Sequence, residues 1–169
     1  MKTLTNYINE GLIADIILKV LDASLNWLGA ASKFIGDNLV SATGELWKSG
    51  KGLTKEFWDD FRERSHFRGD GMPRSERELT KYMAEMYKYN DLPEIKEFLE
   101  KYKDQLPTDF TVNFLVGKAK ETLLNDKASK EEKAEALKIL EEAKTKYPKM
   151  KENIDEILKE YKKKNKGKK

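Results

Sequence analysis

Residues 76–107 read ERELTKYMAEMYKYNDLPEIKEFLEKYKDQLP, and residues 110–148 read FTVNFLVGKAKETLLNDKASKEEKAEALKILEEAKTKYP. Each stretch holds two runs of apolar residues at helical spacing and ends in a proline, Pro107 or Pro148. The spaced positions are Leu79, Met83, Met86, Ile95, Leu99 and Tyr102 in the first stretch, and Val116, Gly117, Ala136, Leu140 and Ala143 in the second. The same order of features twice over predicts two consecutive helical hairpins.

Local signals place the starts of these helices. Ser75, Asp91 and Ser129 each stand three residues before a glutamate, which is the spacing of a capping box. Pro93 follows Asp91 closely, and a proline in the first helical turn sacrifices no hydrogen bond because the amide there has no partner in the helix. The turn chemistry therefore supports the register of the two hairpins.

The repeated pattern resembles the tetratricopeptide repeat (TPR) family, whose unit of about 34 residues is a helical hairpin that ends in a proline. With repeats that start at Glu76 and Phe110, both Pro107 and Gly117 fall where the family has proline and a small residue. Pro148 fits once an insertion around residues 124–130 lengthens the second hairpin's turn. The sequence departs from the family at Ile95 and Tyr102, where alanines are usual.

The resemblance covers residues 76–165 and implies an all-α fold with two TPR-like repeats at 76–150. A capping helix and a lysine-rich tail occupy 151–169. In TPR-like modules the first helix of each repeat lines a groove that binds a protein partner. By position this groove takes in Arg77, Thr80, Ala84, Tyr87, Phe114, Lys118 and Glu121. Thr80 and Ala84 do not match the basic clamp that some members use for a terminal carboxylate, so the implied ligand is of another type.

Residues 1–66 are expected to form amphipathic helices. Between residues 12 and 37 the polar side chains recur at helical spacing and leave only a narrow polar stripe, so the remaining circumference is apolar. Two interpretations stay open: the helices pack on one another, on the repeats or on other copies, or they lie at a lipid interface. The face expected to make the assembly or lipid contact comprises Ile17, Leu21, Trp27, Leu28, Phe34, Trp47, Phe57 and Trp58.

Charge is distributed unevenly along the chain. All five arginines lie between Arg62 and Arg77, around a linker at residues 67–75, and seven lysines fall in residues 159–169. Lys162–Lys169 is a candidate contact for anionic lipid or nucleic acid, the alternative being a solvated end. Forked arginine contacts at the junction indicate a salt-bridged hinge or a docking point.

The residue content argues against an enzyme. The chain has no cysteine and one histidine, His66, which excludes thiolate sites and leaves nothing to pair in a histidine-based metal or proton-transfer site. We therefore expect no catalytic residues, no cofactor and no metal. The sequence predicts a non-enzymatic adaptor or structural protein, cytoplasmic or virion-associated and at most peripheral to a membrane. The alternative is a membrane-active protein, such as a viral ejection component or a secreted pore-former, whose repeats regulate the N-terminal helices.

The apolar N-terminal segment generates a first prediction. A helix this apolar needs more cover than one neighbour provides, so the chain should self-associate or bind lipid. Leu28→Asp should remove several kcal/mol of that contact, since burying the carboxylate and losing the leucine are both unfavourable (roughly 25 cal/mol per Å² of apolar area). Light scattering and liposome flotation of both proteins provide the measurement. A strictly monomeric wild type that ignores anionic liposomes would contradict it.

Overall fold

A computed structural model describes residues 32–69 and 71–167, and all regular structure in this part of the chain is helical. The elements are α2 (Ser32–Ser49), the short 3-10 helix η2 (Gly50–Gly52), α3 (Lys55–Ser65), α4 (Glu76–Tyr89), α5 (Leu92–Lys101), α6 (Thr108–Leu124), α7 (Lys130–Lys146), the 3-10 helix η3 (Pro148–Met150) and α8 (Lys151–Lys166). The predicted all-α fold is confirmed. None of the described helices is both long and apolar enough to cross a bilayer.

Side-chain caps fix where the helices begin. The hydroxyl of Ser75 accepts a hydrogen bond from the Glu78 amide at the start of α4. Asp91 and Ser129 form complete capping boxes with glutamates three residues on, which confirms the predicted starts of α5 and α7. Thr54 caps α3 in the same way, and His66 ends that helix in the left-handed conformation, with φ of 57°.

The second predicted hairpin is present as a packed pair. α6 and α7 lie against each other, and α8 packs on both, as expected of the capping helix. Their shared core consists of Leu92, Val112, Val116, Ala119, Leu123, Ala136, Ile139, Leu140, Ala143, Ile154 and Ile157. Alanines at three of these positions let the helix axes approach closely, which the sequence pattern had anticipated.

The first predicted hairpin packs differently. α4 makes its closest backbone approaches to α2 and α3, and α5 approaches α6. Both helices are nevertheless where the hairpin was predicted, and their buried residues belong to one core.

α2 and α3 share one core with the helices that follow. Leu39, Ala42 and Leu46 of α2 and Phe57 and Phe61 of α3 are fully buried together with residues of α4, α5 and α6. In the linker, the Phe67 ring packs against Tyr82 at a tilt of 42°, and Pro73 is buried. The predicted division into 1–66, 67–75 and 76–150 thus does not separate two cores. In the described part of residues 1–66, α2 and α3 pack on α4, α5 and α6.

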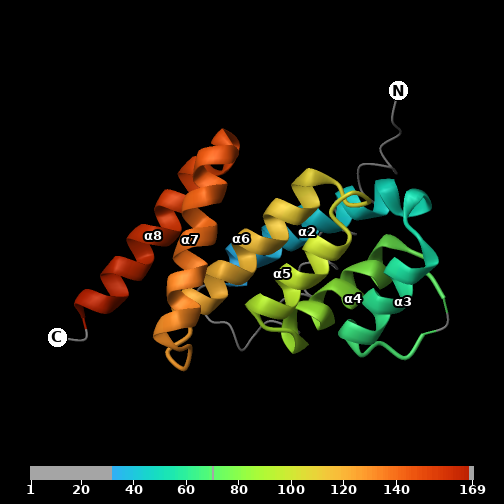
Figure 1. The fold of residues 1–169 in the computed structure, drawn as a ribbon, viewed down its shortest axis with the longest axis horizontal. Helices are drawn as coiled ribbons and strands as arrows, with labels where there is room; N and C mark the ends of the chain where they lie inside the picture. Colours follow the sequence, from blue (N-terminus) through green and yellow to red (C-terminus); the bar gives the residue numbers. More distant parts are fainter. Residues whose placement is uncertain (1–31, 70, 168–169) are drawn as a thin grey trace, which may run out of the picture.

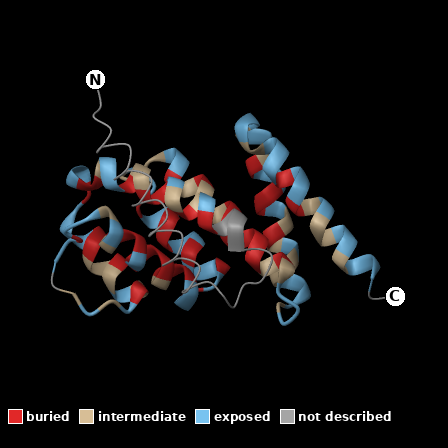
Figure 2. Ribbon diagram, turned by 180° about the vertical axis from the view of Figure 1, so that it is seen from behind, coloured by how far each residue is buried: buried red, intermediate tan, exposed pale blue. Residues whose placement is uncertain are grey.

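Figure 1 shows the resulting layout. α3 and α4 lie at one end of the molecule, α7 and α8 at the other, and α2 runs along α6 between them. Seen from behind in Figure 2, buried residues follow the inner sides of the helices, whereas the outer side of α8 is exposed along its length. The long axis is therefore spanned by the α2–α6 pair.

This shared core predicts that the repeat half is incomplete alone. Residues 72–169 expressed separately should be helical but melt at least several degrees lower than the intact chain, with a broader transition. The reason is that removing α2 and α3 exposes the apolar faces of α4 and α6 to water. Circular dichroism melts of the two proteins test this. An unchanged melting temperature and an equally sharp transition would contradict it.

Candidate functional site

The predicted partner groove is not an open surface. Of its seven residues only Arg77 is exposed, and the buried ones are Thr80, Ala84, Tyr87, Phe114, Lys118 and Glu121. α2 packs along α4 and α6, with hydrogen bonds from Thr43 to Met83 and from Asn113 to Ser41. The two helices that carry these residues are thus covered in part by α2, a helix of the same chain whose apolar side packs on them.

Buried polar groups between the end of α4 and α6 satisfy one another. The Lys118 ammonium donates to the Tyr87 carbonyl oxygen at 2.7 Å and to the Glu121 carboxylate at 2.9 Å, and lies 4.8 Å from the Tyr87 ring centroid. Burial raises the pKa of Glu121, and the neighbouring Lys118 only partly offsets this. Because the Tyr87 carbonyl belongs to the last turn of α4, Lys118 ties the end of that helix to α6.

Tyr87 itself carries an unsatisfied group. Its hydroxyl is buried and has no hydrogen-bond partner among the described residues, and burial raises its pKa. A Cβ built on Gly117 would approach this hydroxyl to 2.8 Å, so the glycine makes room for the tyrosine. The small residue that the sequence pattern located at this position is thus explained by close packing.

The predicted assembly or lipid face is divided by the structure. Phe57 and Trp58 are buried, so their placement on an outer face was wrong. The Phe57 ring lies 5.3 Å from that of Phe98 on α5, and Trp58 packs edge-on against Phe57. The apolar stripe of α3 packs against aromatic residues of α5, and this contact removes it from solvent. Trp47 is 39% exposed and keeps its predicted position on the surface. Ile17, Leu21, Trp27 and Leu28, and the side chain of Phe34, lie outside the described residues.

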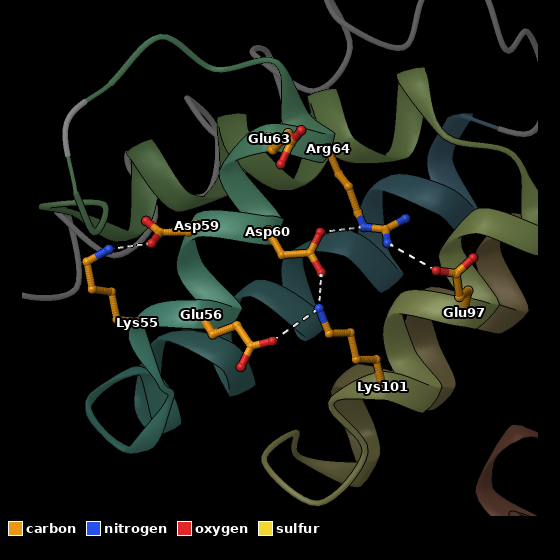
Figure 3. A pocket seen from close by; sticks show the side chains of 8 residues that line it. All are labelled: Lys55, Glu56, Asp59, Asp60, Glu63, Arg64, Glu97 and Lys101. Carbon is orange, nitrogen blue, oxygen red and sulfur yellow. Dashed lines mark hydrogen bonds and ion pairs between the residues drawn. The ribbon is translucent and has the colours of Figure 1, made fainter.

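A charged cluster covers that aromatic core on the outside (Figure 3). It lines a shallow depression of 540 Å³ between α3 and α5 and consists of Lys55, Glu56, Asp59, Asp60, Glu63, Arg64, Glu97 and Lys101. Arg64 pairs with Asp60 and Glu97, and Lys101 pairs with Glu56 and Asp60. The remaining cation, Lys55, pairs with Asp59 within α3. Each positive charge of the cluster is therefore already neutralised by the protein.

Asp60 is the centre of this cluster. Its carboxylate accepts hydrogen bonds from Arg64 Nε at 2.9 Å, from the Tyr102 hydroxyl at 2.9 Å and from Lys101 at 3.3 Å. Burial alone would raise the pKa of Asp60, but the bonds from Tyr102, Arg64 and Lys101 outweigh it and the pKa is lowered. The ionised carboxylate therefore holds α3 to α5, which makes the cluster a structural clamp.

An open groove lies elsewhere, between α5, α6 and α7. We call it the α5–α7 groove; it encloses 270 Å³, and its floor is formed by Leu99, Val112, Leu115, Ile139 and Ala143. Its rim carries both charges, from Lys96, Glu100, Lys103, Glu142 and Lys146, together with Thr111 and Tyr147. Sequence reasoning missed this groove because α5 and α6 belong to different predicted hairpins, and no single amphipathic pattern reports their contact.

Comparison of the chain with protein-family models, curated proteins and solved structures finds no match. Among the described residues there is also no group of histidine and acidic side chains arranged to hold a metal ion.

The clamp predicts a pH-dependent stability. Asp60→Asn should lower the free energy of unfolding at pH 7 by about 1–2 kcal/mol, after allowance for partial solvent screening. Because the folded-state pKa of Asp60 is lowered, its contribution is present above the unfolded value near 3.9 and is lost as the pH falls through the folded value. The difference between wild type and variant in urea melts should therefore shrink from pH 7 to pH 3.

Asp59→Asn is the matched control, since Asp59 lies beside Asp60 but pairs only within α3. Its effect at pH 7 should be clearly smaller. Equal losses from the two substitutions, or an Asp60→Asn effect independent of pH, would show that no clamp operates.

The Tyr87–Gly117 contact gives a second prediction. Gly117→Ala should destabilise the protein by about 1–3 kcal/mol, because the new methyl group meets the Tyr87 hydroxyl in a packed interior. In a Tyr87→Phe background the nearest ring atom is 3.5 Å away, so the same change should instead stabilise by up to about 1 kcal/mol through helix propensity. Denaturant melts of the four proteins measure this coupling, and additive effects would contradict it.

Proposed function

We propose that this protein is a non-enzymatic helical adaptor that binds a protein segment in the α5–α7 groove. The observation that carries the proposal is the groove itself: an apolar floor on three helices, open to solvent and bordered by charged side chains. Binding energy at protein interfaces concentrates where a side chain enters such a pocket and excludes water. The resemblance to TPR-like helical hairpins is compatible with this role. The groove proposed here, however, differs from the one that the resemblance implied.

The chemistry of the groove defines the occupant. Its volume of 270 Å³ accommodates one or two apolar side chains, so a short anchor is favoured over a broad flat interface. On the rim, Lys96 pairs with Glu135 of α7 and Lys103 with Glu100, which leaves a mixed and nearly balanced charge around the opening. We infer an amphipathic segment with one or two apolar anchors and flanks of both charges.

The role of α2 also favours an adaptor. Leu39, Ala42 and Leu46 fasten α2 to the body, so whatever precedes Ser32 in the chain is connected directly to a rigid helical unit. The protein would then present a groove for one partner and the N-terminal segment for attachment to an assembly or a membrane surface. In the alternative of a membrane-active protein, the buried residues between 39 and 61 are not free to contact lipid, because they belong to the core. That alternative therefore depends on the segment before α2.

The proposal predicts a selective effect of Thr111→Arg. Thr111 lines the groove on α6, and an arginine there would lie across the apolar floor. Peptides selected from a displayed library against the full chain should bind this variant at least tenfold more weakly than wild type, measured by fluorescence anisotropy. Bound peptide should also shift the methyl resonances of Val112 and Ile139 in NMR spectra.

Thr145→Arg is the matched control. Both threonines lie on a helix and donate their hydroxyl to the carbonyl oxygen four residues earlier, but Thr145 is outside the groove. Its variant should bind like wild type. Peptides that bind all three proteins equally would show that the groove is not the recognition site.

A further inference from the structure

The outer side of α8 carries two groups of opposite charge. Its N-terminal half presents three acidic side chains and its C-terminal half three lysines, which are Glu152, Asp155 and Glu156, and Lys162, Lys163 and Lys166. All six are exposed, and at about 100° per residue they lie on one side of the helix, with the exposed Lys159 at the centre. We call these seven residues the charged face. Figure 2 shows this outer side of α8 exposed along its length.

The two halves of the charged face mirror each other in spacing and are opposite in sign. Counted outward from Lys159, the charges of the face stand three, four and seven positions away in both directions. Those toward the N-terminus are all acidic, and those toward the C-terminus are all lysines. A helix with this pattern finds its complement in a second copy of itself that runs in the opposite direction.

Contacts within the chain do not account for this arrangement. Asp155 pairs with Lys144 of α7, and the other six residues of the face make no ion pair with a described residue. Within each half, like charges three and four positions apart repel each other along the helix. The helix dipole favours acids in the first turn and lysines in the last, but it falls off before it reaches Glu156 or Lys162. A partner with the opposite charges would relieve both repulsions.

The body of the protein holds the charged face in place. Ile154 and Ile157, on the opposite side of α8, are buried in the core with α6 and α7. Glu160 pairs with Lys120 of α6. α8 lies at one end of the molecule (Figure 1), and no other described helix covers its outer side. Association through this face would therefore order little beyond the charged side chains themselves.

We propose that two copies of this protein associate through α8, with the charged faces packed antiparallel about a twofold axis at Lys159. In a twofold dimer the same residues of both copies form the contact, so each pair occurs twice. Glu152 of one copy then lies level with Lys166 of the other, because both stand seven positions from the axis. The two Lys159 side chains repel each other at the axis, but each can extend toward Glu156 of the other copy, about 4.5 Å along the helix.

The remaining charges pair on the two flanks of the contact. By helical position, Asp155 and Lys162 lie on one flank of the face, and Glu156 and Lys163 lie on the other. A twofold antiparallel pairing brings like flanks together, so each of these acids meets its lysine within about 1.5 Å along the axis. Exposed ion pairs are individually weak, and α8 is only about 24 Å long, so the dimer is expected to be weak and sensitive to salt.

The two signs of the face determine the choice of partner. A nucleic acid or an anionic membrane would attract the lysines but would be repelled by the acidic half of the same face. A second α8 supplies both complements at the required spacing. None of the charged residues of α8 lines the α5–α7 groove, so this inference is independent of the adaptor proposal, and the dimer would present two such grooves.

Charge reversal in two matched variants tests the pairing. Glu152→Lys/Glu156→Lys, the basic variant, and Lys163→Glu/Lys166→Glu, the acidic variant, both leave the ion pair with α7 intact. In sedimentation equilibrium at about 0.01 M salt, the full-length wild type should dimerise with a Kd on the order of 100 µM, and each variant alone at least tenfold more weakly. An equimolar mixture of the two variants should associate as tightly as wild type, because opposite charges meet again.

Lys51→Glu/Lys81→Glu is the control for net charge. Both lysines are exposed, lie on other elements and make no ion pair with a described residue, and the change in charge equals that of the acidic variant. This control should dimerise like wild type and should not restore association when mixed with the basic variant. At about 1 M salt the wild type should dissociate, because the screening length falls to roughly 3 Å. Circular dichroism melts verify that all variants are folded.

Cross-linking tests the direction and register of the pairing. The chain has no cysteine, so a single one can be introduced at a chosen site. Lys159→Cys should give a disulfide-linked dimer with oxidised glutathione, because Cα atoms at the axis of two packed helices come within the roughly 4–7 Å that a disulfide spans. Glu152→Cys should not, because in the antiparallel dimer its two copies lie about 21 Å apart along the axis.

Several contrary results would overturn the proposal. They are a mixture that associates no more tightly than its separate variants, cross-linking through Glu152→Cys but not Lys159→Cys, and self-association that survives in both charge variants and so belongs to another surface. A wild type that stays monomeric at about 1 mM but binds a short DNA duplex would assign the lysines to an anionic partner instead. The groove peptides report on the adaptor proposal separately, so either proposal can fail alone.

Discussion

α2 lies in the angle between α4 and α6, and the burial of this one helix determines what the rest of the molecule can do. α4 and α6 each turn apolar residues toward it, and Leu39, Ala42 and Leu46 fill the space between them. Since each fully buried leucine contributes about 1.5–3 kcal/mol, Leu39 and Leu46 together contribute an amount comparable with a substantial part of the net stability of a small domain, about 5–15 kcal/mol. The faces of α4 and α6 that meet here are therefore covered by a helix of the same chain.

Around α3, aromatic packing and charged hydrogen bonds have different roles. Phe57, Phe61 and Phe98 supply an apolar, aromatic contact that brings α3 and α5 together, with ring centroids 5.3 to 5.9 Å apart. Aromatic packing leaves several orientations close in energy, whereas the three bonds to Asp60 fix one of them. The charges on this surface therefore set the orientation of a helix pair. The open groove of the molecule lies elsewhere, between α5, α6 and α7.

The sequence predicted the elements well because their signals are local. Ser75, Asp91 and Ser129 cap helices where their spacing to glutamate said they would, and Gly117 stands at a close helix contact. The wrong predictions concern which helix packs on which face of its neighbours. Phe57 and Trp58 belong to an apolar stripe, but such a stripe does not reveal which helices cover it, and in the structure α3 shares a core with α4 and α5. Lys118 and Glu121 looked like groove residues because a charge pattern does not reveal that two charges satisfy each other in the interior.

The antiparallel pairing of α2 with α6 also governs how the chain reaches this structure. Ser41 and Asn113 are separated by 72 positions, so the contact that completes the core closes one of the longest loops in the molecule. During synthesis α2 leaves the ribosome well before α6 exists, and its apolar side stays in water for as long as translation needs to supply the missing helix, several seconds at about 5–20 residues per second. Folding of the first core is consequently a late event in the synthesis of the chain, because the residues of α6 that complete it are made last.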